Sequence, residues 1–183
     1  MQIITGKYRA RKLIAPNNEK TRPTLARVKE SIFSTLPLSH EGFITLDLFA
    51  GSGAYGLESL SRGAKKTYFV DESKDAIKAI GYNARNIKDD YEILNTDCFE
   101  ALKELNNKKV KLDLVFLDPP YKSDLGERAI AFIESHEMLA PNGKIIYEHL
   151  NDKKLLPKLL KRYIITMSRN YSDIVVDFIS TES

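Results

Sequence analysis

A glycine-rich turn between a strand and a helix restricts the possible folds of this chain more than any other sequence feature. Residues 44–60, ITLDLFAGSGAYGLESL, begin as an apolar strand pattern, pass through the glycines and continue as a helical pattern. Gly51, Gly53 and Gly56 match G-x-G-x-x-G, and Asp71 ends the next apolar run about twenty residues later. This arrangement is typical of open parallel sheets, in which the backbone of the turn passes close to a nucleotide.

From residue 43 onward, short β-rich runs alternate with helical patterns, as they do in parallel βαβ units. The LDLVFL run is apolar without alternation, which predicts a central strand covered on both faces. The APNG segment at 140–143 predicts a turn, and SRNYSD at 168–173 predicts a connection between antiparallel strands. We therefore predict an α/β, Rossmann-like fold with a mostly parallel seven-stranded sheet and a C-terminal antiparallel strand. Strands are expected near 44–49, 66–70, 91–95, 112–118, 143–148, 164–169 and 173–179, and helices near 55–62, 74–87, 98–106, 125–138 and 151–161.

Residues 1–42 differ from the rest of the chain in charge. Residues 1–29 contain eight lysines and arginines and one glutamate, a net charge of +7, whereas the whole chain has only +3. We expect a small N-terminal extension, made of a short β-hairpin and a helix near 24–36, next to a main domain over residues 43–183. The charge favours a polyanionic partner, and the alternative is a solvated basic flank.

Cysteine and histidine usage excludes several classes of protein. The single cysteine cannot form an internal disulfide, which predicts a reducing, cytoplasmic environment. The three histidines are scattered without metal-ligand spacing, so we expect no metal site. No apolar run has the length of a signal peptide or of a membrane span, so we expect no association with a membrane.

Two features of the glycine turn discriminate between ligands. Asp47 directly precedes the turn, where a carboxylate would repel a pyrophosphate and attract a cation, and no basic residue occurs between Asp47 and Glu58. S-adenosylmethionine carries a sulfonium and an amino group, so we predict this cofactor in preference to a dinucleotide. Asp71 is then expected to bind the ribose hydroxyls. A packing turn that holds no ligand is the remaining alternative.

The third predicted strand ends at Asp97, at the sheet edge where ligands bind in such folds. Asp97 is placed to accept a hydrogen bond from the adenine amine while the amides at Cys98 and Phe99 meet the ring, although Asp97 alone would also serve as a helix cap. Cys98 is expected to be a small packing residue because no activating His or Lys is near it in sequence. The predicted cofactor-binding set is Asp47, Phe49, Gly51, Gly53, Gly56, Asp71, Glu72, Asp97, Cys98, Phe99 and Asp118.

The central strand ends in the tetrapeptide DPPY, residues 118–121. The Asp118 carboxylate and the Pro119 carbonyl are two fixed acceptors that would suit the two hydrogens of an exocyclic amine, and Tyr121 offers a face for a planar base. Such contacts would favour a tetrahedral nitrogen whose lone pair attacks a methyl group. The base must then be unpaired or flipped out of its helix. We predict Asp118, Pro119 and Tyr121 as catalytic residues, the alternative being a proline-rich turn with a capping aspartate.

Taken together, these motifs resemble those of the RsmD family of bacterial 16S rRNA guanine-N2 methyltransferases. The resemblance rests on MQIITGKYRARKL, TRPTLARVKESIFSTL, LDLFAGSGAYGLESLSRGA, VDES, NTDCFEAL and LDPPY, in that order. Ala26 stands where the family usually carries an acid, and Ser172 where glycine is common. A DNA or RNA adenine-N6 methyltransferase shares the glycine turn and the tetrapeptide and is the alternative, and a non-catalytic binding module or a nicotinamide enzyme would need only the fold.

The resemblance implies the S-adenosylmethionine-dependent Rossmann-like methyltransferase fold and methylation of guanine N2 in 16S rRNA, at position 966. The implied partner is the small ribosomal subunit or an assembly intermediate of it, bound by a monomer. The basic extension would contact RNA phosphates without reading sequence. The predicted RNA-binding residues are Lys7, Arg9, Arg11, Lys12, Arg22 and Arg27.

Overall fold

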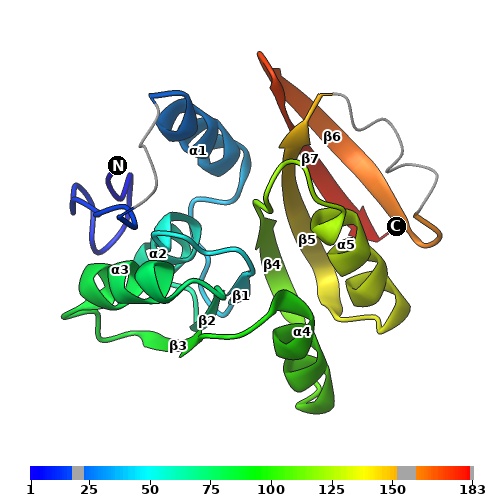
Figure 1. Ribbon diagram of the computed structural model, residues 1–183, viewed down its shortest axis with the longest axis horizontal. Coiled ribbons are helices and arrows are strands. Elements are labelled where there is room, and N and C mark those ends of the chain that lie inside the picture. Colours follow the sequence, from blue (N-terminus) through cyan, green and yellow to red (C-terminus); the bar gives the residue numbers. More distant parts are fainter. Residues whose placement is uncertain (18–22, 152–159, 182–183) are drawn as a thin grey trace.

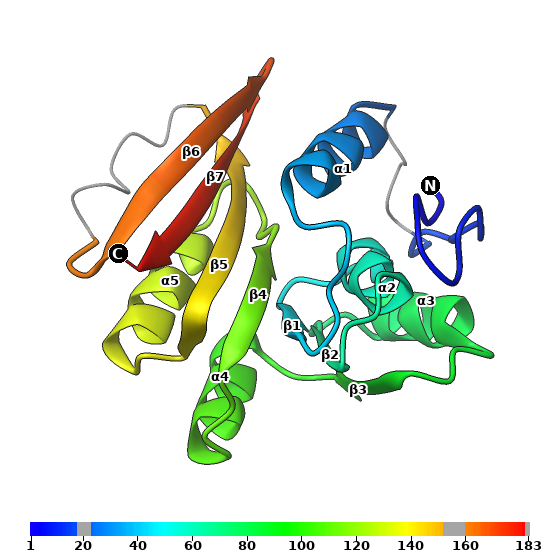
Figure 2. The same cartoon turned by 180° about the vertical axis from the view of Figure 1, so that it is seen from behind.

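A twisted sheet of seven strands with helices on both faces forms the body of the protein (Figures 1 and 2). The structure is a computed structural model and describes residues 1–17, 23–151 and 160–181. The elements follow the order α1 (Pro23–Thr35), β1 (Ile44–Asp47), α2 (Ala54–Ser61), β2 (Lys66–Val70), α3 (Lys74–Ala84), β3 (Asp90–Leu94), α4 (Cys98–Asn107), β4 (Leu112–Leu117), α5 (Leu125–Ser135), β5 (Leu139–Leu150), β6 (Tyr163–Tyr171) and β7 (Ile174–Thr181).

The strand order is β3-β2-β1-β4-β5-β7-β6. Strands β1 to β5 pair in parallel, and β7 is antiparallel to both β5 and β6. The predicted fold class, with its mostly parallel sheet and late antiparallel strand, is confirmed. Because the order reverses between β1 and β4, the carboxyl ends of these two strands open a crevice at the position where ligands bind in such sheets.

Both faces of the central strand β4 are buried, as its apolar run predicts. Val115 and Leu117 pack in a cluster with α4 and α5, whereas Leu114 and Phe116 pack in another with α1. A third cluster joins α2 and α3 to the N-terminal segment and to β2. Helices α1, α2 and α3 therefore lie on one face of the sheet and α4 and α5 on the other.

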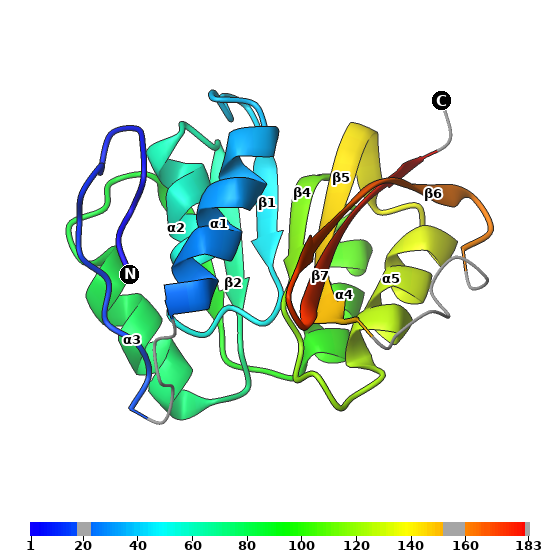
Figure 3. The ribbon, with the colours of Figure 1, turned by 90° about the horizontal axis from the view of Figure 1, so that it is seen from above.

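The N-terminal segment, residues 1–13, forms a short hairpin that is also bonded to α2. The hairpin has one antiparallel bridge, between Gln2 and Lys12, and three backbone hydrogen bonds between residues 1–3 and 10–13. The backbone N–H groups of Ile4 and Thr5 donate to the Glu58 carboxylate, at 2.7 and 3.0 Å. Because these groups are satisfied by a side chain of α2, they need no ladder partner. Figure 3 shows the segment running beside α2 and α3.

Glu58 joins three elements in the interior. Its carboxylate lies 3.0 Å from the Lys29 ammonium of α1 and 3.5 Å from Nε of Arg62, in addition to its bonds to the N-terminal segment. Burial opposes ionisation of Glu58, but the Lys29 charge and the backbone donors outweigh it and hold the pKa of Glu58 below its ordinary value. The N-terminal segment is thus attached to α1 and α2 through one buried ionic centre.

Several predicted boundaries changed. Most of the connection expected at 168–173 lies in β6, and only residues 172–173 form the loop. The APNG segment lies within β5 as an irregularity, since the register shifts between Leu112 and Leu114 and Asn142 has a positive φ. Helices α3 and α5 end earlier than expected, at Ala84 and Ser135. Most of the helix expected at 151–161 falls outside the described residues. Within the described residues, no helix is long and apolar enough to span a membrane.

Candidate functional site

A cavity of about 660 Å³ opens at the carboxyl ends of β1, β2, β3 and β4. It brings together most of the predicted site residues, which lie far apart in sequence. The lining residues are Met1, Leu48, Phe49, Ala50, Gly51, Ser52, Ala54, Tyr55, Asp71, Glu72, Thr96, Asp97, Cys98, Asp118, Pro119, Pro120, Tyr121 and Leu125. Four of these residues are acidic, and none of the described residues in the lining is a lysine or arginine.

The three glycines of the turn have different surroundings. Gly51 lines the cavity with φ +53°, and its N–H donates to Asp71 at 2.9 Å. Gly56 lies beneath the cavity, where a Cβ atom would stand 2.4 Å from the Phe69 ring. Gly53 has φ +76°, and a Cβ atom there would stand 3.3 Å from the Phe69 ring. Gly51 therefore forms the surface, whereas Gly53 and Gly56 let the start of α2 approach β2.

Asp47 is buried under the turn and does not line the cavity. Its Oδ2 accepts a hydrogen bond from the Gly56 N–H at 2.9 Å. Burial, only partly offset by this bond, raises the pKa of Asp47 to about 7. The side chain thus supports the start of α2, and any effect of its charge on a ligand would act from beneath the loop.

Two carboxylates follow β2, one hydrogen-bonded to the backbone (Asp71) and one exposed (Glu72). Asp71 accepts from the N–H groups of Gly51 and Ser73, at 2.9 and 2.8 Å, which ties the glycine turn to the start of α3. Glu72 is exposed and lines the cavity. The Asn95 amide donates to the backbone carbonyls of both acidic residues. Glu72 therefore has the more open carboxylate for a ligand at this edge.

Asp97 caps α4, which is the alternative that its sequence position allowed. Its carboxylate accepts from the N–H groups of Phe99 and Glu100, at 2.9 and 3.3 Å, so the Phe99 amide is engaged by the cap. Asp97 and Cys98 line the cavity. Burial raises the pKa of the Cys98 thiol to about 11, so the thiol is protonated at neutral pH, as a packing residue requires.

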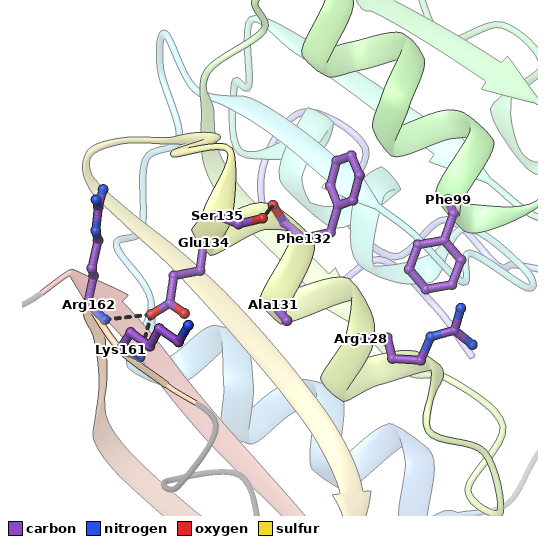
Figure 4. A pocket seen from close by; sticks show the side chains of 8 residues that line it. All are labelled: Phe99, Arg128, Ala131, Phe132, Glu134, Ser135, Lys161 and Arg162. Carbon is purple, nitrogen blue, oxygen red and sulfur yellow. Dashed lines mark hydrogen bonds between the residues drawn. The ribbon is translucent and has the colours of Figure 1, made fainter.

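The Phe99 side chain lies in a different hollow, of about 730 Å³, between α4, α5 and the start of β6 (Figure 4). The Arg128 guanidinium stands 4.6 Å from the centre of the Phe99 ring. Glu134, from the same helix as Arg128, accepts from the backbone N–H groups of residues 161–163. The Phe99 side chain is therefore separated from the other predicted cofactor residues, although its amide directly follows Cys98.

The tetrapeptide at the end of β4 faces the glycine turn across the cavity. Asp118, Pro119 and Tyr121 all line it. The Pro120 carbonyl accepts from the N–H and Oγ of Ser123, at 3.0 and 2.6 Å, which closes the turn after the strand. The predicted catalytic residues are thus placed on the wall opposite Gly51.

Two residues next to this wall were missed by sequence reasoning. The Tyr121 hydroxyl donates to Oε1 of Glu148 at 2.9 Å, and the Tyr55 hydroxyl donates to Oε2 at 3.1 Å. Tyr55 lies within the G-x-G-x-x-G motif, between Gly53 and Gly56, and Glu148 is a buried acid inside β5. A charged residue in a strand that is otherwise apolar was the available signal for Glu148.

Two of the predicted RNA-binding residues bond to other residues of the chain, and one of these two, Lys7, is also exposed. Lys7 forms an ion pair with Asp89, and Arg11 donates to the backbone carbonyl of Arg85. The side chains of Arg9 and Lys12 are exposed on the N-terminal segment, and that of Arg27 is exposed on α1. Arg22 lies outside the described residues.

Comparison with known proteins shows which family this chain belongs to. A family model described as conserved hypothetical protein 95 matches residues 1–180. A relative from Haemophilus influenzae, named Ribosomal RNA small subunit methyltransferase D, is 39% identical over 160 residues, which are 85% of this chain and 82% of the relative. The chain belongs to the RsmD family. The resemblance in the sequence blocks is thereby confirmed.

Further comparisons within the family agree in sequence and in fold. The relative of the same name from Escherichia coli K12 is 34% identical over 149 residues, or 81% of this chain and 74% of the relative. The solved structure of the methyltransferase yhhF from Escherichia coli superposes with a TM-score of 0.86 at 27% identity, covering 100% of this chain and 98% of that one. Both of these curated relatives are named as ribosomal RNA methyltransferases, and the matches span 82% and 74% of their lengths.

Proposed function

We propose that this chain transfers the methyl group of S-adenosylmethionine to the exocyclic N2 of a guanine in 16S rRNA. The observation that carries the proposal is the cavity lining, in which the glycine turn faces the DPPY tetrapeptide among four acidic residues. Without a lysine or arginine among the described lining residues, the cavity suits a cationic ligand better than a pyrophosphate. Membership of the RsmD family supports the same reaction class and an rRNA substrate.

The residues of the cavity fit this cofactor. When bound, S-adenosylmethionine supplies a methyl group on a positively charged sulfur, which makes the carbon open to attack. Gly51 lets the backbone approach the ligand. The ribose hydroxyls, predicted for Asp71, are assigned to the open carboxylate of Glu72, because Asp71 already accepts from Gly51 and Ser73. Asp97 and Cys98 flank the position assigned to adenine. Asp47 acts indirectly, by holding the Gly56 N–H beneath the turn.

The target base is assigned to the tetrapeptide wall. Asp118 and the Pro119 carbonyl accept the two hydrogens of the guanine amine, and the Tyr121 ring stacks on the base. Hydrogen bonds that favour a tetrahedral N2 strengthen toward the transition state and so contribute to the rate. The amine can release its proton after methyl transfer, so no separate strong base is needed.

The exposed basic residues supply the RNA contact. Arg9, Lys12 and Arg27 are exposed, and the N-terminal segment also reaches the cavity through Met1. Phosphate contacts along this segment would hold the RNA in register while one unpaired guanine enters the cavity. We propose that a monomer acts in this way on the small subunit or an assembly intermediate, at guanine 966.

Transfer of labelled methyl groups tests this function. Purified protein and labelled S-adenosylmethionine are incubated with small-subunit particles, with naked 16S rRNA and with DNA, and the methylated product is digested to nucleosides. Label in N2-methylguanosine from rRNA, mapped to one position, is the expected result. Label in N6-methyladenosine would favour the adenine alternative. Calorimetric titration with S-adenosylhomocysteine and with NAD separates both from a nicotinamide enzyme.

A further inference from the structure

A single buried carboxylate joins the two walls of the cavity. Glu148 lies in β5 and is 2% exposed. It accepts hydrogen bonds from Tyr121, on the tetrapeptide wall, and from Tyr55, at the start of α2 on the glycine-turn wall. Both tyrosines line the cavity, whereas Glu148 does not. The carboxylate therefore fixes the hydroxyl of one aromatic side chain from each side while staying behind them.

The Tyr55 side of this bridge is held rigidly by aromatic packing. The Tyr55 ring stacks on Phe116 of β4, with centroids 5.2 Å apart and an interplanar angle of 12°. It also stacks on Phe33 of α1, with centroids 6.1 Å apart. Stacked neighbours on the ring and a carboxylate at the hydroxyl leave Tyr55 little rotational freedom. Glu148 is thus anchored to a fixed point on one side.

The chemistry of the bridge requires an acceptor with two equivalent oxygens. An ionised glutamate only accepts hydrogen bonds, so each of its oxygens can take one phenol O–H without competition. Hydrogen bonds away from water are stronger and more persistent than those at the surface. Burial raises the pKa of Glu148, and the bonds from Tyr121 and Tyr55 act against this by favouring the charged form.

We propose that Glu148 is a positioning residue for methyl transfer, which holds the Tyr121 ring at a fixed distance from the glycine-turn wall. The inference rests on the proposed function, in which Tyr121 stacks on the target base. Through Glu148, the surface that receives the base is tied to the surface that receives the cofactor. A displaced Tyr121 would leave the guanine amine out of line with the methyl group, and misalignments of this kind are costly to the rate.

The test is a mutant cycle on the turnover number. Glu148→Gln keeps the size of the side chain but replaces one acceptor oxygen with a donor amide, and Tyr121→Phe keeps the ring but removes its hydroxyl. We expect each change to lower kcat on the order of 10-fold. Affinity for S-adenosylhomocysteine and KM for RNA should change little, because the cofactor residues and the phosphate contacts are intact. In the double variant kcat should resemble that of the more affected single variant, because both changes break the same bond.

A merely structural role for Glu148 predicts different results. It would give kcat losses that multiply in the double variant, or a loss that disappears once kcat is normalised to folded protein, and either result would overturn the inference. Glu134→Gln is the matched control, because Glu134 is also a buried acceptor but lies on α5 outside the cavity. It should lower the melting temperature without changing kcat of the folded fraction.

A second pair keeps the inference testable if Glu148→Gln does not fold. Tyr55→Phe and Tyr121→Phe remove the two donors separately and leave Glu148 in place. Since the two hydroxyls share one carboxylate, their effects on kcat should be non-multiplicative, and independent effects would overturn the proposal. Wild-type protein that methylates no RNA would overturn the proposed function together with this inference. Wild-type activity with independent effects overturns the inference alone.

Discussion

Asp118 is the residue whose side chain the proposed reaction needs most directly. It directly follows the last residue of β4 and lines the cavity opposite the glycine turn. We expect Asp118→Ala to lower kcat by at least about 100-fold, because it removes an acceptor that acts on the amine in the transition state. Affinity for S-adenosylhomocysteine should fall far less, since Gly51, Glu72 and Asp97 remain. Methyl transfer to small-subunit RNA and calorimetric titration measure the two effects.

Asp124→Ala is the matched control for this change. Asp124 is an exposed carboxylate on the same turn, paired with Arg128 and outside the cavity lining. Its removal should leave turnover within about twofold of the wild type, as expected of an exposed ion pair. Nearly normal turnover of Asp118→Ala would remove Asp118 from the mechanism.

The raised pKa of Asp47 should make the free energy of unfolding depend on pH. Its folded-state pKa is raised to about 7, chiefly by burial, above the 3.8 of a free side chain. Between these values the folded state binds more protons than the unfolded state, so the free energy of unfolding should fall as pH rises from about 4 to about 7. The contribution amounts to about 4 kcal/mol at most.

The comparison with Asp47→Asn isolates this effect. Asparagine is uncharged and keeps an oxygen for the Gly56 N–H, so the variant should lose this part of the pH dependence. In urea unfolding at pH 4.5, 6 and 8, its stability relative to the wild type should increase with pH. A difference that stays constant over this range would show that Asp47 is not protonated in the folded protein at pH 6.

Residue types in the sequence predicted which residues gather at the site better than they predicted where each side chain points. Gly51, Asp71 and Asp118 each lie at or just after the carboxyl end of a predicted strand. Because the carboxyl ends of parallel strands lie at the same edge of a sheet, the sequence was enough to predict that these residues share one site. It could not show that Asp47 points under the turn, or that the Phe99 side chain lies in another hollow. Those facts depend on side-chain direction, which sequence spacing does not fix. Glu148 was not anticipated, because its partners lie 27 and 93 residues away.

At the level of elements, a two-residue loop joins β6 and β7. Ser172, its first residue, has φ +55°, a left-handed conformation that costs a side-chain-bearing residue about 1 kcal/mol or more. Two-residue hairpin loops favour glycine at positions with positive φ. We expect Ser172→Gly to raise the free energy of unfolding by about 0.5 kcal/mol, after allowance for the extra freedom of glycine in the unfolded chain.

Ser34→Gly is the control for this prediction, because the same substitution should there have the opposite effect on stability. Ser34 is exposed in α1, where glycine is a poor helix former, so this change should lower stability by about 0.5 kcal/mol. Chemical denaturation of the three proteins under one set of conditions compares the effects. Loss of stability in Ser172→Gly would mean that the Ser172 side chain contributes more than its backbone strain costs.

Elements with strong local patterns were predicted well, and those that depend on distant partners were not. The LDLVFL run gave β4, since a strand buried on both faces must be apolar throughout. The N-terminal hairpin is short because the backbone N–H groups of Ile4 and Thr5 donate to Glu58, more than fifty residues away, and not to the other arm. The APNG segment has turn-forming residues, but β4 pairs with Leu139 before it and with Lys144 after it, which holds the segment within β5.

At the scale of the whole molecule, charge is divided between two neighbouring surfaces. The cavity is lined by acidic residues, whereas the N-terminal segment beside it carries Arg9 and Lys12 in exposed positions. Ile14, the residue just after the segment, is tied to the cavity wall by Asn83, whose amide donates to the carbonyls of Ile14 and Ser52, each at 2.9 Å. A polyanion held by the segment would thus lie next to a site that does not itself attract phosphate.

This division predicts that RNA affinity and cofactor affinity can be changed separately. We expect the double variant Arg9→Ala/Lys12→Ala to weaken RNA binding by about tenfold at moderate salt, because two phosphate contacts are lost. The slope of log affinity against log salt should become shallower by about 1 to 2, as fewer counterions are released. Affinity for S-adenosylhomocysteine should not change, since neither side chain lines the cavity.

The control removes the same charge from the other face of the sheet. Lys103 and Lys109 are exposed on and just after α4, so Lys103→Ala/Lys109→Ala has the same net charge as the test variant. Filter binding of small-subunit RNA at several salt concentrations should show no loss specific to this pair. Equal losses in both double variants would mean that overall charge, and not the N-terminal segment, holds the RNA. A loss confined to Arg9 and Lys12 would locate the RNA path on the segment that leads to Met1 and the cavity.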